Sequence, residues 1–214
     1  EGRKAKALVE RVRKDIAAAL NCLPAEVIFT SGGTEADNWA LQSSVDVLGA
    51  TKLYHSELEH HAVTHMVEAL AQHIEAVAIP FDEYGDHDLD WLEAQLAADR
   101  QAGRKPLVSL MHANNEIGNL ADLERLSKIT RDHGALLHSD TVQTMAHLKL
   151  DFAATPLEFA ACSAHKFHGP KGIGFAYIKQ GTGVQPFIRG GAQERGHRAG
   201  TENVVGIAGL GAAF

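Results

Sequence analysis

A single lysine, Lys166, lies between an apolar run and a glycine-rich turn, in the sequence SAHKFHGPKG of residues 163–172. A lysine at such a place can be stripped of water and kept ready to form a Schiff base. Burial lowers the pKa of a lysine, and only the neutral amine attacks a carbonyl carbon. Most lysines are solvated surface charges, so this run becomes evidence for a Schiff-base lysine only in combination with other residues.

A second candidate is the turn in residues 27–36, VIFTSGGTEA, where a strand ends in two glycines and a helix begins near Thr34. Free backbone amides at a helix N-terminus can bind a phosphate together with the Thr34 hydroxyl, and Gly33 permits close backbone approach. The alternative is an ordinary strand–helix turn in which Thr34 caps the helix and Asp37 lies in its first turn. The spacing fits neither a dinucleotide fingerprint nor a P-loop.

Asp140 ends another apolar run, in LHSDTVQ of residues 137–143. A buried aspartate is costly unless it is paired. A protonated pyridine nitrogen would be a suitable partner, because the ion pair keeps the ring cationic and able to act as an electron sink. The alternative is a helix-capping or surface aspartate. Taken together, Lys166, Asp140 and the turn at 32–34 favour an enzyme that uses pyridoxal phosphate.

Two further segments contain residue types that bind ligands. His60 precedes a helical pattern, where it could stack on an aromatic cofactor or remain a solvated loop histidine. His61 and His65 are one helical turn apart, but no third ligand accompanies them, so we expect no metal site. The glycine- and arginine-rich segment 189–201, which ends at Thr201, is typical either of a functional loop or of a solvated, mobile one.

The elements that must position these residues follow from apolar patterning. We predict helices over 1–20, 34–48, 62–72, 89–98, 120–133 and 203–214, and strands over 27–30, 52–55, 76–79, 107–112, 136–140, 159–163 and 174–178. Strands that alternate with helices predict an α/β fold with a mostly parallel sheet covered on both faces. Sites in such sheets lie at the carboxyl ends of the strands, where Gly33, Asn115, Asp140 and Lys166 are expected.

Composition narrows the class of protein. The 214 residues carry 20 basic and 27 acidic side chains, a net charge of −7, which argues against nucleic-acid or anionic-membrane binding. No apolar run is long enough to span a bilayer. The two cysteines are far apart in the sequence and form no metal-binding pair, which favours a reducing compartment, the cytoplasm. Helical patterns at both ends lead us to expect that this chain is a fragment.

Six motifs resemble those of one family in the same order: FTSGGTEADN (29–38), EHHAV (59–63), MHANNEIG (111–118), HSDTVQT (138–144), SAHKFHGPKGIG (163–174) and GGAQERGHRAGT (190–201). The chain resembles the cysteine desulfurases of the NifS/IscS type, within the class V aminotransferases of the fold-type I pyridoxal phosphate enzymes. That resemblance implies a three-layer α-β-α domain with a mostly parallel seven-stranded sheet. Residues 1–214 would be the large, cofactor-binding domain, and the missing N- and C-terminal parts would make the small domain.

The resemblance also implies roles for individual residues. Lys166 would form the Schiff base and shuttle protons, while His60 would stack on the ring and assist proton transfer. Asp140 would pair with the pyridine nitrogen. The other implied contacts are Gln143 and Asn115 near the phenolic oxygen, Gly33, Thr34, Ser163 and His165 at the phosphate, and Thr201 at the phosphate of a partner subunit in a homodimer.

The implied reaction converts L-cysteine to L-alanine and an enzyme persulfide, which supplies sulfur to an acceptor or scaffold protein for iron–sulfur cluster or thiolated-cofactor assembly. Neither Cys22 nor Cys162 matches the family's sulfur-accepting cysteine, so the fragment itself is expected to lack it. Three alternatives remain: a selenocysteine lyase, another aminotransferase-like member of the class, or a catalytically inactive module with the same fold.

Overall fold

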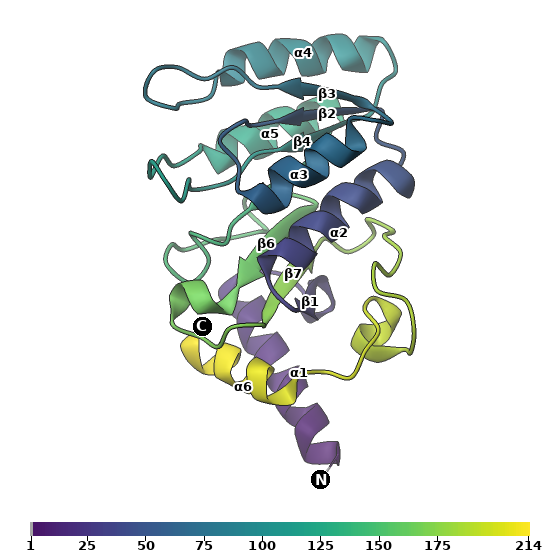
Figure 1. Cartoon of the computed structure of the whole chain (residues 1–214), viewed down its shortest axis with the longest axis vertical. Helices are drawn as coiled ribbons and strands as arrows, with labels where there is room; N and C mark the ends of the chain where they lie inside the picture. The colour runs from purple at the N-terminus through teal and green to yellow at the C-terminus, as the bar shows by residue number, and fades with distance from the viewer. Residues whose placement is uncertain (1) are drawn as a thin grey trace.

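Seven strands form one sheet in the order β1-β7-β6-β5-β4-β2-β3, in a computed structural model that describes residues 2–214 (Figure 1). β7 is antiparallel to both of its neighbours, and the other four neighbouring pairs are parallel. The predicted mostly parallel, seven-stranded sheet is therefore confirmed. The strands are β1 (Val27–Thr30), β2 (Lys52–His55), β3 (Glu75–Ala78), β4 (Pro106–Ser109), β5 (Leu136–Asp140), β6 (Phe159–Ser163) and β7 (Gly174–Ile178).

Helices cover both faces of the sheet, which makes three layers. They are α1 (Gly2–Ala19), α2 (Gly33–Asp46), α3 (His61–Leu70), α4 (Leu89–Gln101), α5 (Leu123–His133) and α6 (Val204–Ala213). In Figure 1, α2 and α3 lie in front of the sheet, while α1 and α6 pack together at the end where both chain termini are found. Glu1, which the sequence placed in the first helix, lies outside the described residues.

The two faces arise from the alternation of side chains along each strand. In β1, Phe29 packs in the core with α1, α4, α5 and α6, whereas its neighbour Ile28 packs against α2. In β2, Tyr54 belongs to the first of these cores and Leu53 packs with α3. Because successive residues of a strand serve opposite faces, most strand residues are apolar, and the polar ones lie mainly at the strand ends.

Local signals set the ends of the helices, and some predicted ends were wrong. α5 begins at Leu123 rather than 120, because Asp122 caps it by accepting the Arg125 amide, while Leu120 pairs with Ala113 in an isolated bridge. α2 begins at Gly33 and ends at Asp46, so its N-cap is Gly32 and not Thr34. α3 ends at Leu70, two residues early, and α4 continues three residues further than predicted, to Gln101.

Two strands also differ from their predicted bounds. β4 ends at Ser109 rather than at 112, although the amides of Leu110 and His112 still donate to carbonyls of β5. β3 is displaced by one residue toward the N-terminus, and Ile79 instead donates its amide to His55. Within residues 2–214, no helix combines the length and apolar character needed to cross a membrane.

The sheet direction decides where polar strand ends meet. β1, β5 and β6 all point the same way, since β7 is antiparallel to both β1 and β6, and β6 is parallel to β5. Their carboxyl ends therefore share one edge of the sheet, which carries the turn after Thr30, the carboxylate of Asp140 and the segment that follows Ser163. This edge is where ligands bind in open α/β sheets.

Candidate active site

One cavity of about 130 Å³ lies at that edge and gathers residues from five separate segments of the chain. Nine of the ten residues that the sequence singled out line it; Thr201 does not. Asp37, Met111 and Val142 also line the cavity and were not predicted there. The full lining is Gly33, Thr34, Asp37, His60, Met111, Asn115, Asp140, Val142, Gln143, Ser163, His165 and Lys166.

Lys166 reaches the cavity from a short 3-10 helix, η2 (Ala164–Phe167), that follows β6 directly. The C-cap of this helix is His168, which has a left-handed φ of 67° and turns the chain toward β7. The backbone carbonyl of Lys166 lies 3.0 Å from His147 Nε2. The residue itself is exposed, so the expectation that burial strips this lysine of water was wrong for the chain by itself.

The turn between β1 and α2 provides a set of free backbone amides. Gly32 has φ +155° and ψ −173°, a conformation open almost only to glycine, and no side chain caps the helix that follows. A Cβ on Gly33 would lie 2.6 Å from Val142 Cγ2, so only glycine fits there. The first amides of α2 therefore face this edge without side-chain partners, as an anion-binding helix N-terminus requires.

Ser163 and His165 lie beside this turn. Ser163 Oγ is 2.9 Å from His165 Nδ1 and would lie 3.4 Å from a Cβ on Gly32. Burial, followed by the charges of Lys166 and Lys171, lowers the pKa of His165. A neutral imidazole and a hydroxyl therefore stand next to the free amides, which gives this corner of the cavity polar groups without a negative charge.

Asp140 is buried at the end of β5, where its Oδ1 accepts the Val142 amide at 2.9 Å. Burial, and secondarily the neighbouring Asp37, raises the pKa of Asp140 to about 7. A carboxyl with a pKa of about 7 titrates near neutral pH, and a cation that enters the cavity favours its ionised form, because the ion pair offsets part of the desolvation. The sequence placed Asp140 correctly at a buried strand end.

Two more buried acids surround Asp140. Asp37, on α2, has Oδ1 3.2 Å from His138 Nε2, and His138 Nδ1 lies 2.9 Å from Ser109 Oγ. Burial raises the pKa of Asp37 well above its ordinary value and lowers that of His138 to about 4, so both changes favour the neutral forms. The sequence assigned Asp37 only to the first turn of a helix and gave no sign of its burial.

Glu59 is the third buried acid, and it ties the segment before α3 to the segment after β4. Its Oε1 accepts the Met111 amide at 2.6 Å, while its Oε2 has no hydrogen-bond partner among the described residues. Burial, followed by the charge of Asp140, raises the pKa of Glu59 well above its ordinary value. Three acids share one desolvated region, which is a costly arrangement for a chain without a compensating cation.

The aromatic and amide side chains come from the neighbouring segments. His60 is the N-cap of α3, and its Nδ1 accepts the Ala62 amide at 3.1 Å, which leaves Nε2 as the protonated nitrogen of the neutral ring. Gln143 follows β5. Asn115 lies in the segment after β4, where its side-chain amide donates to the Glu116 carboxylate at 2.7 Å. His60 and Asn115 are exposed, so both can face a ligand.

Thr201 lies apart from the other predicted residues. It lines a separate cavity of about 80 Å³ together with Ser31, Arg198 and Gly200. The segment around it is irregular, as predicted, apart from a short 3-10 helix, η3 (Gln193–Gly196), that contains two residues with left-handed φ, Glu194 and Arg195. Within one chain, Thr201 does not reach the cavity that holds Lys166.

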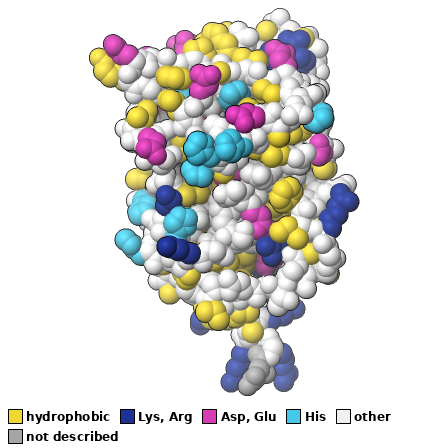
Figure 2. Space-filling model, viewed as in Figure 1, with side chains coloured by type: hydrophobic (Ala, Val, Ile, Leu, Met, Phe, Trp, Pro, Cys, Tyr) yellow, Lys and Arg dark blue, Asp and Glu magenta, His cyan; other side chains and the backbone are white. Residues whose placement is uncertain are grey.

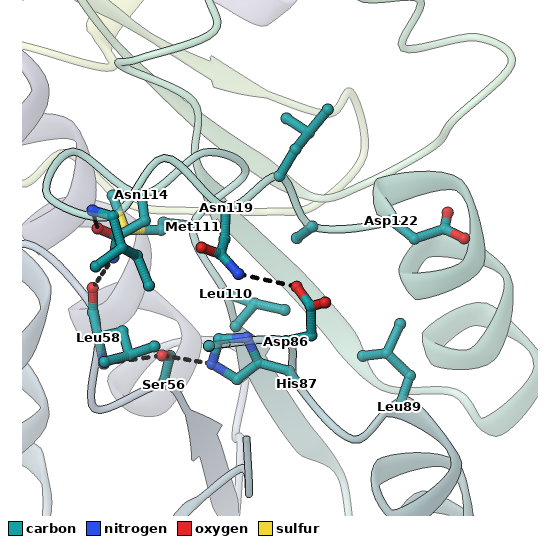
Figure 3. Close-up of a pocket in the computed structure, with 14 residues that line it drawn as sticks. Ser56, Leu58, Asp86, His87, Leu89, Leu110, Met111, Asn114, Asn119 and Asp122 are labelled. Atoms are coloured by element: carbon teal, nitrogen blue, oxygen red, sulfur yellow. Dashed lines mark hydrogen bonds between the residues drawn. The ribbon is translucent and has the colours of Figure 1, made fainter. Parts of the chain in front are cut away.

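A second, larger cavity of about 240 Å³ adjoins the first, with Met111 on the wall of both (Figure 3). Two pairs of polar side chains bond to each other within its wall: His87 Nε2 lies 2.7 Å from Ser56 Oγ, and Asn119 donates to Asp86 at 2.9 Å. Burial lowers the pKa of His87, which favours the neutral ring. This cavity was not predicted from the sequence.

The histidines of α3 lie on the surface. Figure 2 shows histidine side chains gathered near the middle of the face in view. The rings of His61 and His65 stack with centroids 5.2 Å apart, and His60 lies beside them at 6.2 Å from His61. Among residues 2–214, no group of three or more His, Cys, Asp or Glu side chains is placed to hold a metal ion.

Both thiols are in environments that suppress reactivity. Cys162 is fully buried in β6, and burial raises its pKa well above the ordinary value. Burial and the neighbouring Glu26 raise the pKa of Cys22 to about 12. Because the thiolate is the nucleophile, neither thiol is activated for attack on sulfur.

This predicts the reaction with a thiol reagent. In the folded protein at pH 8, we expect Cys22 to react with Ellman's reagent about a thousandfold more slowly than in the same protein unfolded in guanidinium, because the thiolate fraction falls with rising pKa. Cys162 should not react until the protein unfolds. A fast native-state reaction mapped to either residue would contradict the assignment of both as unreactive.

Comparisons with known proteins agree with this geometry. The model of the family Aminotransferase class-V matches residues 1–214. The cysteine desulfurase IscS of Dictyoglomus turgidum is 42% identical over 219 residues, which cover 100% of this chain and 54% of that protein. The IscS of Methanosarcina thermophila is 39% identical, with 99% of this chain and 52% of that protein covered. The chain thus spans about half the length of the curated relatives it matches.

Solved structures give the same result. A NifS-like protein superposes with a TM-score of 0.92 at 35% sequence identity, covering 99% of this chain and 58% of its own. A structure described as SspA in complex with cysteine superposes with a TM-score of 0.91 at 28% identity, covering 99% of this chain and 61% of its own. The predicted three-layer architecture of the NifS type is therefore confirmed.

Proposed function

Since the chain belongs to the class V aminotransferase family, we propose that it is the large, cofactor-binding domain of a pyridoxal phosphate-dependent cysteine desulfurase. The observation that carries the proposal is the single cavity in which Lys166, the buried carboxyl of Asp140 and the free amides of α2 meet. Relatives named cysteine desulfurase IscS, 37–42% identical, support the choice of reaction within the family.

The residues present fit the cofactor. A buried acid with its pKa raised to about 7 suits a cationic pyridine nitrogen, because pairing stabilises both ionised groups. The uncapped N-terminus of α2, with Ser163 and His165 beside it, suits a phosphate dianion. Lys166 lines the same cavity and suits the aldehyde. The pyridine nitrogen, the phosphate and the aldehyde of the cofactor thus each have a matching group on the cavity wall.

When bound, pyridoxal phosphate supplies an electron sink for the negative charge that forms at the α-carbon of an amino acid. Lys166 Nζ would hold the cofactor covalently and, once the substrate has displaced it, take the α-proton and return it. Asp140 would keep the proton on the pyridine nitrogen. His60 would stack on the ring face and assist proton transfer, while Asn115 and Gln143 would orient the ring through its phenolic oxygen.

The proposed reaction moves the sulfur of L-cysteine to a thiol of the enzyme. The C–S bond breaks, an S–S bond forms, and L-alanine leaves as the enzyme thiol becomes a persulfide. The accepting thiol must be ionised and mobile. Burial raises the pKa of both Cys22 and Cys162, so neither thiol is ionised, and we propose that the acceptor lies outside these 214 residues, in agreement with the half-length coverage of the relatives.

The partners belong to the same proposal. Thr201 lies away from the cavity of its own chain, which supports a homodimer in which it reaches the phosphate in the partner's cavity. The persulfide would pass to an acceptor or scaffold protein for iron–sulfur cluster or thiolated-cofactor assembly. The free, unpaired cysteines suit a reducing compartment, and we propose the cytoplasm.

Two measurements test the proposal. Added pyridoxal phosphate should give the purified protein an absorption band that borohydride removes, with the reduced cofactor mapped by mass spectrometry to Lys166. The same protein should exchange the α-proton of L-cysteine with deuterated solvent, a step that needs Lys166 but no accepting thiol. A folded protein that shows neither the band nor the exchange would overturn the proposal.

A further inference from the structure

Two arginine–glutamate pairs fasten the segment 190–201, called here the arginine loop, to the body of the chain. Arg13 binds Glu194 through two hydrogen bonds, of 2.7 and 2.9 Å, and both side chains are about 3% exposed. Arg198 binds Glu35 in the same paired manner, with Nε 2.9 Å from Oε1 and Nη2 3.1 Å from Oε2. The first pair anchors the loop to β1, where Glu194 also accepts the Phe29 amide.

The second pair ends on the proposed phosphate-binding turn. Glu35 is the third residue of α2, and its Oε2 accepts the Ser31 amide at 2.8 Å. Its side chain therefore reaches back over Gly32 and Gly33 and closes the turn from within, in the manner of the glutamate in a capping box. The turn is held by Glu35, and Glu35 is held by Arg198.

The same pair also sets the charge at the turn. Partial burial by itself raises the pKa of Glu35, but the hydrogen bonds from Arg198 and Ser31 outweigh it and lower the pKa, so the carboxylate is ionised. An ionised carboxylate near a phosphate would repel it. The Arg198 guanidinium, with a side chain only 21% exposed, neutralises that carboxylate at short range, so the free amides retain their attraction for an anion.

We propose that Arg198 is a positioning residue that makes the turn at 31–34 selective for a phosphorylated ligand, by fixing and neutralising Glu35. This inference rests on the proposed function, because it takes the turn as the phosphate site. Arg198 contacts the turn through Glu35 and lines the cavity that also contains Ser31 and Thr201. The arginine loop would thereby link Thr201, which is proposed to reach the partner subunit, with the phosphate-binding turn of its own chain.

The test compares two aldehydes that differ only in the phosphate, pyridoxal phosphate and pyridoxal. Their dissociation constants are measured from the absorption of the Lys166 adduct. Arg198→Ala should weaken the binding of pyridoxal phosphate about tenfold or more, as expected for a charge-assisted pair, and that of pyridoxal by less than about threefold. Arg198→Lys, which retains the charge without the paired geometry, should lie between wild type and Arg198→Ala.

Two further variants separate positioning from general structural support. Glu35→Gln combined with Arg198→Ala should recover part of the lost affinity for pyridoxal phosphate, because the amide still accepts from Ser31 and no longer repels the phosphate. Arg195→Ala is the matched control, since Arg195 lies in the same loop but binds Glu10 and the Pro24 carbonyl. It should leave both dissociation constants unchanged.

A third readout needs no cofactor. Exchange of the Ser31 amide hydrogen, which Glu35 accepts, should be faster in Arg198→Ala than in wild type, and unchanged in Arg195→Ala. Equal weakening of the binding of both aldehydes in Arg198→Ala, or unchanged exchange of the Ser31 amide, would overturn the inference while leaving the proposed function intact. A wild-type protein that forms an adduct with neither aldehyde would overturn the proposed function and this inference together.

Discussion

Replacing Lys166 with alanine should abolish the borohydride-reducible adduct with pyridoxal phosphate and reduce α-proton exchange in L-cysteine to the background rate. Lys166 is the only lysine on the described wall of the cavity, and no other side chain there can form an imine with an aldehyde. The fold should remain, because the residue is exposed and its hydrogen bond to His147 is made by its backbone carbonyl, which the substitution keeps. Absorption spectra before and after borohydride, with far-UV circular dichroism, check both parts.

Lys171→Ala is the matched control for this experiment. Lys171 is also exposed, lies five residues further along the same glycine-rich segment and influences the charge environment of His165, but it does not line the cavity. It should retain the adduct and the exchange rate. A reducible adduct that persists in Lys166→Ala and maps to another lysine would show that the covalent role was assigned to the wrong residue.

Asp140→Asn should stabilise the cofactor-free protein at pH 8 while it disables cofactor chemistry. The folded pKa of Asp140 is about 7, above the unfolded value of about 3.9. The folded state therefore binds more protons between these two values, so this group's contribution to stability is complete below about pH 4 and is lost as the pH rises through 7. Asparagine carries no proton to lose, so this part of the pH dependence disappears.

The expected change in the free energy of unfolding is large. A difference of about three pKa units corresponds to roughly 4 kcal/mol, so Asp140→Asn should be more stable than wild type at pH 8 by up to a few kcal/mol and similar to it at pH 4. The gain in stability also includes the loss of charge repulsion between Asp140 and Glu59, since the charge of Asp140 raises the pKa of Glu59. Urea unfolding of both proteins at the two pH values measures the difference.

The same substitution should slow α-proton exchange in L-cysteine about a hundredfold or more, because asparagine cannot hold a proton on the pyridine nitrogen as an ionised carboxylate does. Asp46→Asn, at the exposed end of α2, is the control and should change stability by less than about 0.5 kcal/mol. If Asp140→Asn instead destabilised the protein at both pH values, Asp140 would have a structural role.

Much of the fold could be predicted from patterning, because the strands are buried on both faces and read as short apolar runs between helices. Five of the seven strands have the predicted bounds, including β1, β5 and β6, which carry the candidate site. The errors lie at the ends of elements, where apolar patterning does not specify the boundary. Asp122 starts α5 late through its cap, and β4 stops at Ser109 although the next residues are still apolar.

The candidate site could be predicted in part. Its polar residues follow strand ends, and parallel strands bring those ends to one edge, so Gly33, Asp140 and Lys166 were expected together. Asp37 was missed because its burial depends on which face of α2 packs against β5. The exposure of Lys166 was missed for a related reason. How far neighbouring elements cover a side chain depends on tertiary packing, which the local sequence around Lys166 does not specify.

The sequence by itself determined the alternation of elements, the glycine-dependent turn and the residue types at each strand end, because these depend on local conformation and on contacts a few residues apart. Only the tertiary structure decided which of those residues share a cavity, which acids lose their solvent, and that Arg198 binds Glu35 across 163 positions of the chain. The physical reason is that burial and electrostatic coupling depend on the distance between elements in space, which no spacing along the chain specifies.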